Sequence, residues 1–295
     1  MPALGDLQSA SILNRRETDL LLAFLLKKSR TFILSHPEKK LTAAQYRRFN
    51  DLVNARRSGM PLAYLTGEQS FYNLNLKVSS QVLIPRPETE IIVDLILEDL
   101  AQLPRPLNII DIGTGSGAII LSLAENIKKQ QANIFLLSSF FGLDISASAL
   151  CIARQNANKY GQKIHFFKRD LLNNIPEKIR QVLFDDDSNK PLELIITANL
   201  PYLTLAQIQA SPSIQCEPNL ALNGGRDGLK YYRALFRQIN KYKTKLKKIT
   251  IYCEIDPSQK KTILKLAAAL IPQATYNIYR DLRKKNRFLK IVWTK

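Results

Sequence analysis

A glycine-rich segment, Asp111-Ile112-Gly113-Thr114-Gly115-Ser116-Gly117, follows a short apolar run and precedes an amphipathic stretch. Glycine permits sharp turns and a close approach of the backbone to a ligand, so the segment predicts a binding loop between a strand and a helix. With Ala118 it also matches the fingerprint Gly-x-Gly-x-x-Ala, which leaves a nicotinamide cofactor open. The loop residues expected to contact a cofactor are Gly113, Thr114, Gly115, Ser116 and Gly117.

Three acidic residues stand at the ends of three successive predicted strands. Asp111 stands two residues before the first glycine, where it could hold an ammonium group directly or through water but would repel a pyrophosphate. Asp144 could accept hydrogen bonds from ribose hydroxyls, and Asp170, beside Leu171, could reach an adenine amino group. The alternative is that Asp144 and Asp170 only cap helices. Together with the glycine loop, the three acids predict a site for a cationic nucleoside, and S-adenosylmethionine is such a ligand.

The tetrapeptide Asn199-Leu200-Pro201-Tyr202 follows an apolar run that ends in Thr197. It predicts a catalytic loop for methylation of a planar amide or amine nitrogen, which is a poor nucleophile because its lone pair is delocalised. Asn199 Oδ1 and the carbonyl of Leu200 could accept both N–H bonds and hold the nitrogen in line with an activated methyl group. Pro201 restricts the loop, and Tyr202 could stack on the flat amide. No general base is needed, because the proton can leave after the methyl group arrives.

The elements around these residues alternate between strands and helices, which is typical of an α/β domain with a doubly wound, mostly parallel sheet. In such sheets ligands bind at the carboxyl ends of the strands, where the loops above begin. The expected strands are residues 107–111, 134–144, 163–167 and 192–197. The expected helices are residues 89–100, 118–127 and 146–160.

The first part of the chain follows a different pattern. Apolar residues recur there at helical spacing, and Thr42 with Gln45 makes a capping box. Segments 71–78 and 81–84 then alternate between apolar and polar residues, which predicts a hairpin. We therefore expect a small helical substrate-recognition domain at residues 1–70, a linking β-hairpin at 71–87, and a methyltransferase domain at 88–295.

The chain is strongly basic, with a formal net charge of +18 over 295 residues. Residues 237–295 hold 16 Lys and Arg against 3 acids, so they contribute 16 − 3 = +13 of that charge. This segment favours proximity to the ribosome or RNA, although a solvated lysine-rich surface would look the same. The acidic run at 185–190 is expected to be a solvated loop.

Several classes of protein are disfavoured. Three cysteines without Cys-x-x-Cys spacing and only two histidines predict no metal site, and they suit a reducing cytoplasm. The longest apolar run, Leu20 to Leu26, is much shorter than the ~20 residues of a membrane span. The N-terminus has no apolar region of a secretion signal. We expect a cytoplasmic monomer that does not enter a membrane.

Four further stretches give the chain a resemblance to a known family. These are Arg56 to Gly67, the block Leu83-Ile84-Pro85-Arg86-Pro87-Glu88-Thr89-Glu90, Glu217 to Leu222, and Gly224 to Arg233. With the two loops above, they make the sequence similar to the release factor glutamine methyltransferases over nearly its whole length. That family methylates the glutamine of the Gly-Gly-Gln loop in peptide chain release factors.

The resemblance implies which residues do the work. It places S-adenosylmethionine on Gly113 to Gly117, Asp144, the Asp170-Leu171 turn and Asn199. It places the substrate glutamine on Asn199, Leu200, Pro201 and Tyr202. The chain departs from the family pattern at three positions: Leu200 replaces a proline, Leu171 an aromatic residue and Asp256 a glycine. Leucine keeps the backbone carbonyl at 200, and we expect its N–H to be unused, so that Leu200→Pro would be tolerated and slightly stabilising.

Other functions remain open at this point. Asn-Leu-Pro-Tyr also occurs in rRNA adenine methyltransferases, and an rRNA or DNA adenine N6-methyltransferase would suit the positive charge. A glutamine methyltransferase that acts on a ribosomal protein shares the fold, but differs after the Pro-Arg pair. A nicotinamide oxidoreductase is disfavoured by Asp111. Because Leu200 departs from the motif, a binding module without activity also stays open.

Overall fold

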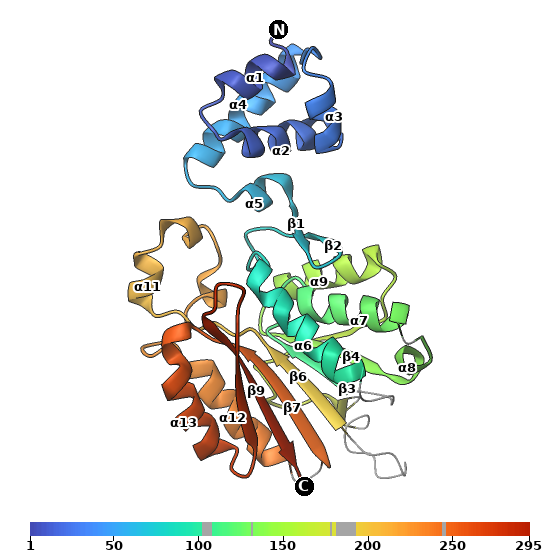
Figure 1. The fold of residues 1–295 in the computed structure, drawn as a ribbon, viewed down its shortest axis with the longest axis vertical. Coiled ribbons are helices and arrows are strands. Elements are labelled where there is room, and N and C mark those ends of the chain that lie inside the picture. The colour runs from blue at the N-terminus through green and yellow to red at the C-terminus, as the bar shows by residue number, and fades with distance from the viewer. Residues whose placement is uncertain (102–107, 131, 178, 181–192, 244–245) are drawn as a thin grey trace. The chain divides into compact units, whose positions relative to one another are not determined.

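A computed structural model describes the chain except for residues 102–107, 131, 178, 181–192 and 244–245 (Figure 1). The chain forms two compact units. One comprises Met1–Glu68 with Pro212–Cys216, and the other comprises Gln69–Ser211 with Glu217–Lys295. The expected acidic loop at 185–190 lies outside the described residues.

The smaller unit is helical, as the sequence predicts. Its own core includes the fully buried Leu21, Leu22 and Ile33. The capping box is confirmed: Thr42 accepts a hydrogen bond from the Gln45 N–H, and the Gln45 side chain accepts one from the Thr42 N–H. The helices are α1 (Leu4–Ala10), α2 (Arg15–Leu26), α3 (Arg30–Ser35), α4 (Ala43–Arg57) and α5 (Leu62–Thr66).

A hairpin follows, but its strands are not those expected. They are β1 (Glu68–Phe71) and β2 (Leu74–Lys77), which form a two-stranded sheet. The prediction of strands at 71–78 and 81–84 was wrong, because Tyr72 adopts a left-handed conformation (φ 52°) and turns the chain inside the first alternating segment. Residues 81–84 form no strand. The Ile84 N–H instead donates to a buried side-chain carboxylate.

The larger unit contains a seven-stranded sheet with the order β5-β4-β3-β6-β7-β9-β8. The five strands from β5 to β7 are parallel, while β9 runs antiparallel to both β7 and β8. The predicted doubly wound, mostly parallel sheet is thereby confirmed. The strands are β3 (Asn108–Ile112), β4 (Ser139–Asp144), β5 (His165–Lys168), β6 (Glu193–Ala198), β7 (Lys248–Glu254), β8 (Thr275–Arg280) and β9 (Asn286–Thr294).

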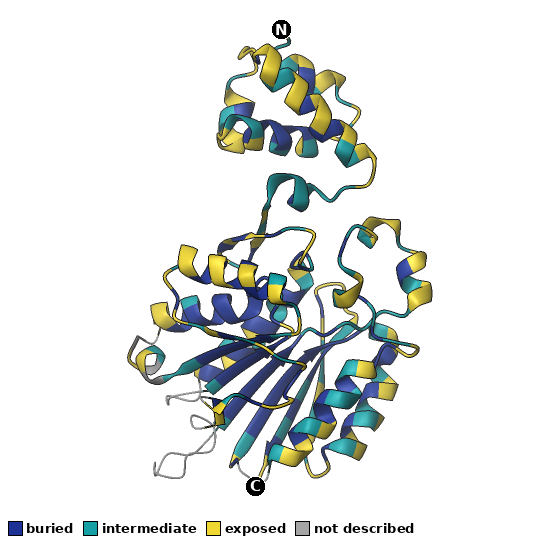
Figure 2. Ribbon diagram, turned by 180° about the vertical axis from the view of Figure 1, so that it is seen from behind, coloured by how far each residue is buried: buried dark blue, intermediate teal, exposed yellow. Residues whose placement is uncertain are grey.

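Helices cover both faces of this sheet (Figure 1). Because successive side chains of a strand point to opposite faces, Ile109 joins the core beneath α6 and α7, while Ile110 joins the core beneath α12 and α13. The central strands β3, β4, β6 and β7 are buried almost throughout, whereas exposed residues lie on the outer helix surfaces, in loops and on the edge strand β8 (Figure 2). The helices are α6 (Glu90–Ala101), α7 (Ala118–Gln130), α9 (Ala147–Lys159), α12 (Lys230–Tyr242) and α13 (Lys260–Leu270).

One further strand was predicted too long. The segment expected to be a strand at 134–144 is a strand only from Ser139, because α8 (Ala132–Leu137) occupies its first part. Within the described part of the chain, no helix combines the length and the hydropathy that crossing a bilayer requires. The remaining short elements are η1 (Pro87–Thr89), α11 (Leu205–Gln209), η2 (Pro212–Ile214), η3 (Asn219–Ala221) and η5 (Pro257–Gln259).

Candidate active site

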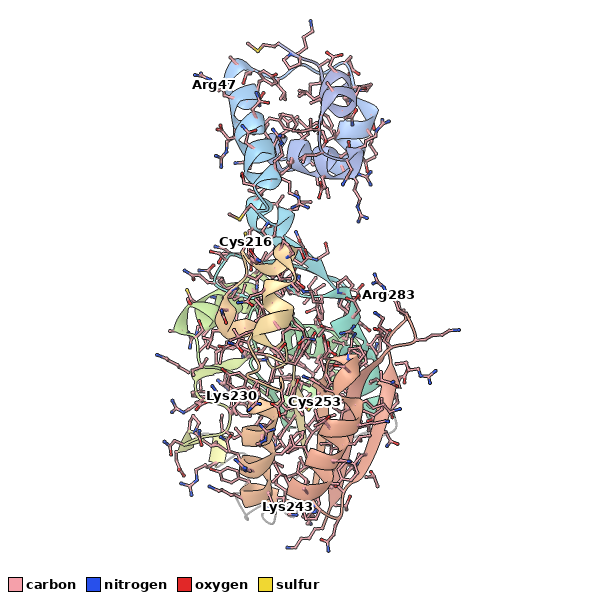
Figure 3. All side chains as sticks on the ribbon, turned by 90° about the vertical axis from the view of Figure 1, so that its left-hand side faces the viewer. Arg47, Cys216, Lys230, Lys243, Cys253 and Arg283 are labelled. Atoms are coloured by element: carbon pink, nitrogen blue, oxygen red, sulfur yellow. The ribbon has the colours of Figure 1, made fainter. Side chains whose placement is uncertain are left out.

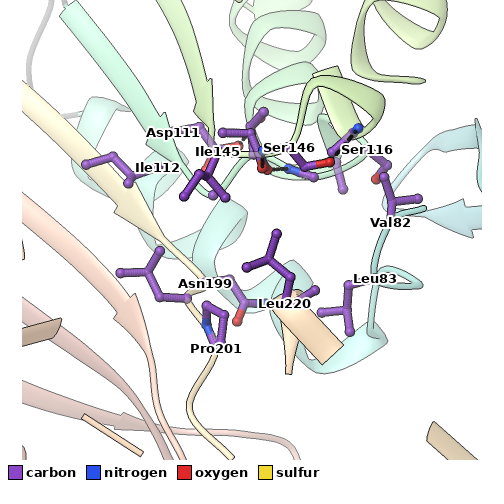
Figure 4. A pocket seen from close by; sticks show the side chains of 18 of the residues that line it. Val82, Leu83, Asp111, Ile112, Ser116, Ile145, Ser146, Asn199, Pro201 and Leu220 are labelled. Carbon is purple, nitrogen blue, oxygen red and sulfur yellow. Dashed lines mark hydrogen bonds between the residues drawn. The ribbon is translucent and has the colours of Figure 1, made fainter. Parts of the chain in front are cut away.

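A cavity of about 260 Å³ lies at the carboxyl ends of the parallel strands of the larger unit. Asp111, Ile145 and Ser146 lie on one side of it, and Asn199, Pro201 and Leu220 lie on the other (Figure 4). The two loops that the sequence singles out therefore face the same space. Of the predicted site residues, those that line the cavity are Asp111, Gly113, Thr114, Gly115, Ser116, Asp144, Asp170, Leu171, Asn199, Leu200 and Pro201.

Asp111 is buried at the base of the glycine loop, with only 1% of its surface exposed. Its two carboxylate oxygens accept hydrogen bonds from Thr114 Oγ1 (2.7 Å) and Thr197 Oγ1 (2.6 Å). Burial raises the pKa of Asp111 to about 6, although both threonine donors act to lower it. A carboxylate has about four acceptor positions, so Asp111 can still receive a cationic group from the cavity.

Asp144 holds the glycine loop against β4. Its Oδ2 accepts from the Gly115 N–H at 2.9 Å, and its Oδ1 accepts from the Ser146 N–H at 2.8 Å. Burial raises the pKa of this carboxyl, and the backbone donors oppose the rise. Asp144 thus binds two backbone N–H groups and also lines the cavity with acceptor positions to spare, while its contact with ribose hydroxyls stays a prediction.

Asp170 and Leu171 form the next turn along this wall. Asp170 is exposed, while Leu171 is buried in a left-handed conformation (φ 54°) and also packs into the sheet core. Ile145, directly after Asp144, is half-exposed and lines the cavity, as does Leu220 on the opposite side. Sequence reasoning missed these two residues, although apolar side chains directly after a strand-end acid are a signal that could have found Ile145.

Asn199 lies at the end of β6 with its side-chain amide held by two acceptors. Its Nδ2 donates to Thr89 Oγ1 (3.2 Å) and to Glu254 Oε2 (3.1 Å). The nitrogen of this amide is therefore committed to the protein. Oδ1 is left as the amide atom that can accept a hydrogen bond from a ligand.

Leu200 is more deeply embedded than its sequence position indicates. Only 3% of it is exposed, and its N–H donates to Tyr232 Oη at 3.3 Å. The expectation that this N–H is unused was therefore wrong, because the buried amide finds a partner from α12. A Cβ at Gly113 would lie 3.1 Å from Leu200 Cδ2, so the leucine side chain occupies space that the absent side chain of Gly113 leaves free.

Tyr202 is the one member of the tetrapeptide that is not among the residues lining the cavity. Its hydroxyl donates to Glu254 Oε1 at 2.9 Å, and its carbonyl accepts from Gln259 Nε2 at 2.9 Å. Gly117 also lies outside the cavity lining, where it begins the turn into α7. A substrate contact by the Tyr202 ring stays a prediction.

Glu254 is the main residue that sequence reasoning missed. It ends β7, is only 1% exposed, and accepts from Thr89 Oγ1 at 2.5 Å in addition to Asn199 and Tyr202. Burial raises the pKa of Glu254, whereas the Thr89 and Tyr202 donors lower it. Residues 249–253 are a mostly apolar stretch that is followed directly by an acid, so the rule that selects Asp111 and Asp144 could also have selected Glu254.

The other family-like stretches make contacts with one another and with the catalytic loop. Buried Glu217 accepts from the Ile84 N–H (3.0 Å) and forms an ion pair with Arg86, which joins two blocks that are far apart in the chain. Gly228, with φ +69°, lies where a Cβ would come within 2.1 Å of the Tyr202 carbonyl oxygen. Only glycine allows this approach without displacing the loop.

Comparisons with known proteins agree with this architecture. A family model described as PrmC N-terminal domain matches residues 6–67, and one described as methyltransferase domain matches residues 105–268. A release factor glutamine methyltransferase of Dictyoglomus turgidum is 32% identical over 280 residues, which cover 94% of this chain and 90% of that protein. One of Moorella thermoacetica is 36% identical over 226 residues, covering 75% and 71%.

Solved structures bear on the fold alone. The hMettl16 catalytic domain in complex with MAT2A 3′UTR hairpin 1 has a TM-score of 0.53 at 13% identity, covering 92% of this chain and 90% of that one. The same domain with hairpin 6 has a TM-score of 0.51 at 14% identity, covering 86% and 82%. The chain shares the sheet architecture of these catalytic domains.

Proposed function

Since the chain belongs to the release factor glutamine methyltransferase family, we propose that it methylates the glutamine of the Gly-Gly-Gln motif in peptide chain release factors. The methyl group comes from S-adenosylmethionine and is transferred to the side-chain amide nitrogen, N5. The observation that carries this proposal is the orientation of the Asn199 side-chain amide. Its amide nitrogen is held by Thr89 and Glu254, so its oxygen is left to bind a substrate N–H at a cavity shared with the glycine loop.

The cavity fits S-adenosylmethionine. Asp144 has acceptor positions for the ribose hydroxyls, and Asp111 offers a buried negative charge to the ammonium group. The half-exposed Ile145 and the exposed Asp170, next to Leu171, suit the apolar faces and the amino group of adenine. Gly113, Gly115 and Gly117 adopt positive φ angles, which glycine tolerates because it has no Cβ, and Thr114 and Ser116 between them are buried.

The substrate amide is held by acceptors alone. Asn199 Oδ1 and the Leu200 carbonyl accept its two N–H bonds, which orients the nitrogen and favours the positive charge that develops on it. Pro201 keeps the Leu200 backbone extended, and Tyr202 stands beside the flat amide. Bound S-adenosylmethionine supplies a sulfonium methyl group: the N–CH₃ bond forms as the S–CH₃ bond breaks, S-adenosylhomocysteine leaves, and one amide proton passes to solvent.

The rest of the chain serves recognition in this proposal. The helical domain at residues 1–70 contacts the release factor outside the active site, the segment 71–87 links it, and residues 88–295 carry the reaction. The enzyme acts as a cytoplasmic monomer. The basic segment at 237–295 brings it near ribosomal RNA, and its cations are spread widely: Arg283 and Lys243 lie at opposite ends of the larger unit (Figure 3).

Methylation assays with labelled S-adenosylmethionine test the function. We expect label in an intact release factor, none in a factor whose Gly-Gly-Gln glutamine is replaced by alanine, and none in ribosomal RNA. Label in RNA but not in the factor would replace the proposal with an adenine methyltransferase.

Asn199→Ala separates chemistry from cofactor binding in the same assay. Because Asn199 binds the nucleophile in this proposal, turnover should fall by about 10²-fold or more, as when one transition-state hydrogen bond is lost. The Kd of S-adenosylmethionine, measured by calorimetry, should change far less. Equal losses in turnover and in cofactor affinity would make Asn199 chiefly a cofactor residue.

A further inference from the structure

Glu254 receives hydrogen bonds from three side chains, two of which belong to the catalytic loop. Thr89 comes from η1 (2.5 Å), Asn199 from the end of β6 (3.1 Å), and Tyr202 from the catalytic loop (2.9 Å). The carboxyl is 1% exposed, so water does not compete for these bonds. An ionised carboxylate only accepts hydrogen bonds, so each of the three partners must turn a donor toward it.

This requirement decides which way the Asn199 amide faces. The oxygen and the nitrogen of an asparagine side chain have nearly the same size, so packing alone does not distinguish the two orientations. With its nitrogen turned away from Glu254, Asn199 would present a donor to the substrate amide, which also carries donors. With its nitrogen toward Glu254, it presents the acceptor that methyl transfer needs.

Thr89 strengthens the same choice. Its hydroxyl hydrogen is used on Glu254 Oε2, so its lone pairs remain for Asn199 Nδ2 at 3.2 Å. Both atoms that face the Asn199 nitrogen are therefore acceptors. The threonine lies in the Pro87-Glu88-Thr89-Glu90 block, so this contact gives that block a role in the chemistry.

Resting on the proposed function, we propose that Glu254 is a positioning residue that, directly and through Thr89, fixes the Asn199 amide with its oxygen toward the substrate nitrogen. The Tyr202 hydroxyl, bound to the other carboxylate oxygen, keeps the carboxyl group in the plane that serves both partners. Glu254 is not among the residues that line the cavity, and its effect on the reaction passes through Asn199.

A spectroscopic test needs no activity. The side-chain amide signals of Asn199 are assigned by their loss in Asn199→Ala, and their shifts and hydrogen exchange are then compared between the native protein and Glu254→Gln. We expect slow exchange in the native protein and a changed shift with faster exchange in the variant. Unchanged signals in a folded Glu254→Gln protein would overturn the proposal. Should that variant not fold, Thr89→Val removes one of the two acceptors without touching the carboxylate and is read in the same way.

Kinetics give a second test. Glu254→Gln should lower kcat by about 10- to 100-fold, as when a group that orients a reacting side chain is removed, with little change in cofactor Kd. In the Asn199→Ala background it should cause no further loss, because its effect passes through Asn199. Additive losses would show a general effect on the fold and overturn the assignment.

A matched control is available on the same strand. Tyr252 is buried in β7 and donates to Asp99, another tyrosine–carboxylate hydrogen bond, but away from the cavity. Tyr252→Phe should leave kcat unchanged, whereas Tyr202→Phe should lower it. If native protein fails to methylate the release factor while the Asn199 signals still respond to Glu254→Gln, the proposed function fails and the positioning role stands.

Discussion

Replacing Leu200 by proline tests how the catalytic loop is held. The resemblance to the glutamine methyltransferases implies a proline at this position, and Pro201 already keeps residue 200 out of the helical region, so we expect the backbone to accept a proline ring. The structure adds two costs that the sequence did not reveal. The substitution removes the N–H that donates to Tyr232 Oη, and it replaces a buried leucine side chain.

The magnitude follows from three contributions. The net contribution of a hydrogen bond to stability is about 0.5–1.5 kcal/mol. The bond from the Leu200 N–H to Tyr232 Oη is long at 3.3 Å, so we place its contribution at about 0.5–1 kcal/mol. Proline has one side-chain carbon fewer, which costs about 0.8 kcal/mol when buried. Proline also restricts the unfolded chain, and the smaller loss of conformational entropy on folding stabilises the native state by about 0.4–1 kcal/mol. Leu200→Pro should therefore destabilise the fold by about 0.3–1.4 kcal/mol.

Denaturant titration measures this free energy, and a double-mutant cycle with Tyr232→Phe isolates the hydrogen bond. In the Tyr232→Phe background the substitution should cost less, because the acceptor is already absent. Turnover should stay close to that of native protein, since the carbonyl of residue 200 is retained. A net stabilisation of Leu200→Pro would show that the N–H contributes nothing. A loss above about 3 kcal/mol, the scale of core disruption, would show that the backbone here cannot accept proline.

Three further predictions concern the cofactor and the substrate. Asp144→Ala should weaken S-adenosylmethionine binding by about 1.5–3 kcal/mol, the range for hydrogen bonds to a charged group, and unchanged affinity in calorimetry would remove Asp144 from the site. Because the pKa of Asp111 is about 6, lowering the pH through 6 protonates it and removes the charge that faces the ammonium group; affinity should fall below pH 6 and level off above pH 7. Asp111→Asn should flatten this dependence between pH 5 and 8, and a slope that persists would assign it to another group. Removal of residues 1–67 should leave cofactor affinity intact but abolish methylation of the whole release factor; full activity would give the helical domain another role.

The fold could be predicted because its signals are local. Alternating strands and helices gave the doubly wound sheet, and the glycine loop and Asn199 marked the two sides of the cavity. The hairpin was misplaced because alternation does not show where a chain turns. The chain turns at Tyr72, which adopts a left-handed conformation that is uncommon for tyrosine and that the sequence does not predict. The strand that ends at Asp144 was predicted too long because the short apolar run at 134–137 suits a helix equally well.

The partners of the catalytic loop were beyond sequence reasoning for a different reason. Asn199 and Glu254 are 55 residues apart, and Thr89 is 110 residues before Asn199. Their contact depends on β6 pairing with β7, which the order of elements along the chain does not fix. The acceptor of the Leu200 N–H, Tyr232 in α12, is likewise distant in the sequence and could not be inferred from it.

The acids at the strand ends correctly predicted that the site lies at the carboxyl edge of the sheet, but they did not show what each acid does. Asp170 is exposed, Asp144 receives two backbone N–H bonds, Asp111 receives two threonine hydroxyls, and Glu254 receives three side-chain donors. A carboxylate has about four acceptor positions, so the donors it already holds determine what remains for a ligand. Asp144 and Asp111 keep capacity at the cavity wall, which suits cofactor binding. Three of the acceptor positions of Glu254 are occupied by protein donors. This is the physical reason why Glu254 orders the loop instead of contacting a ligand.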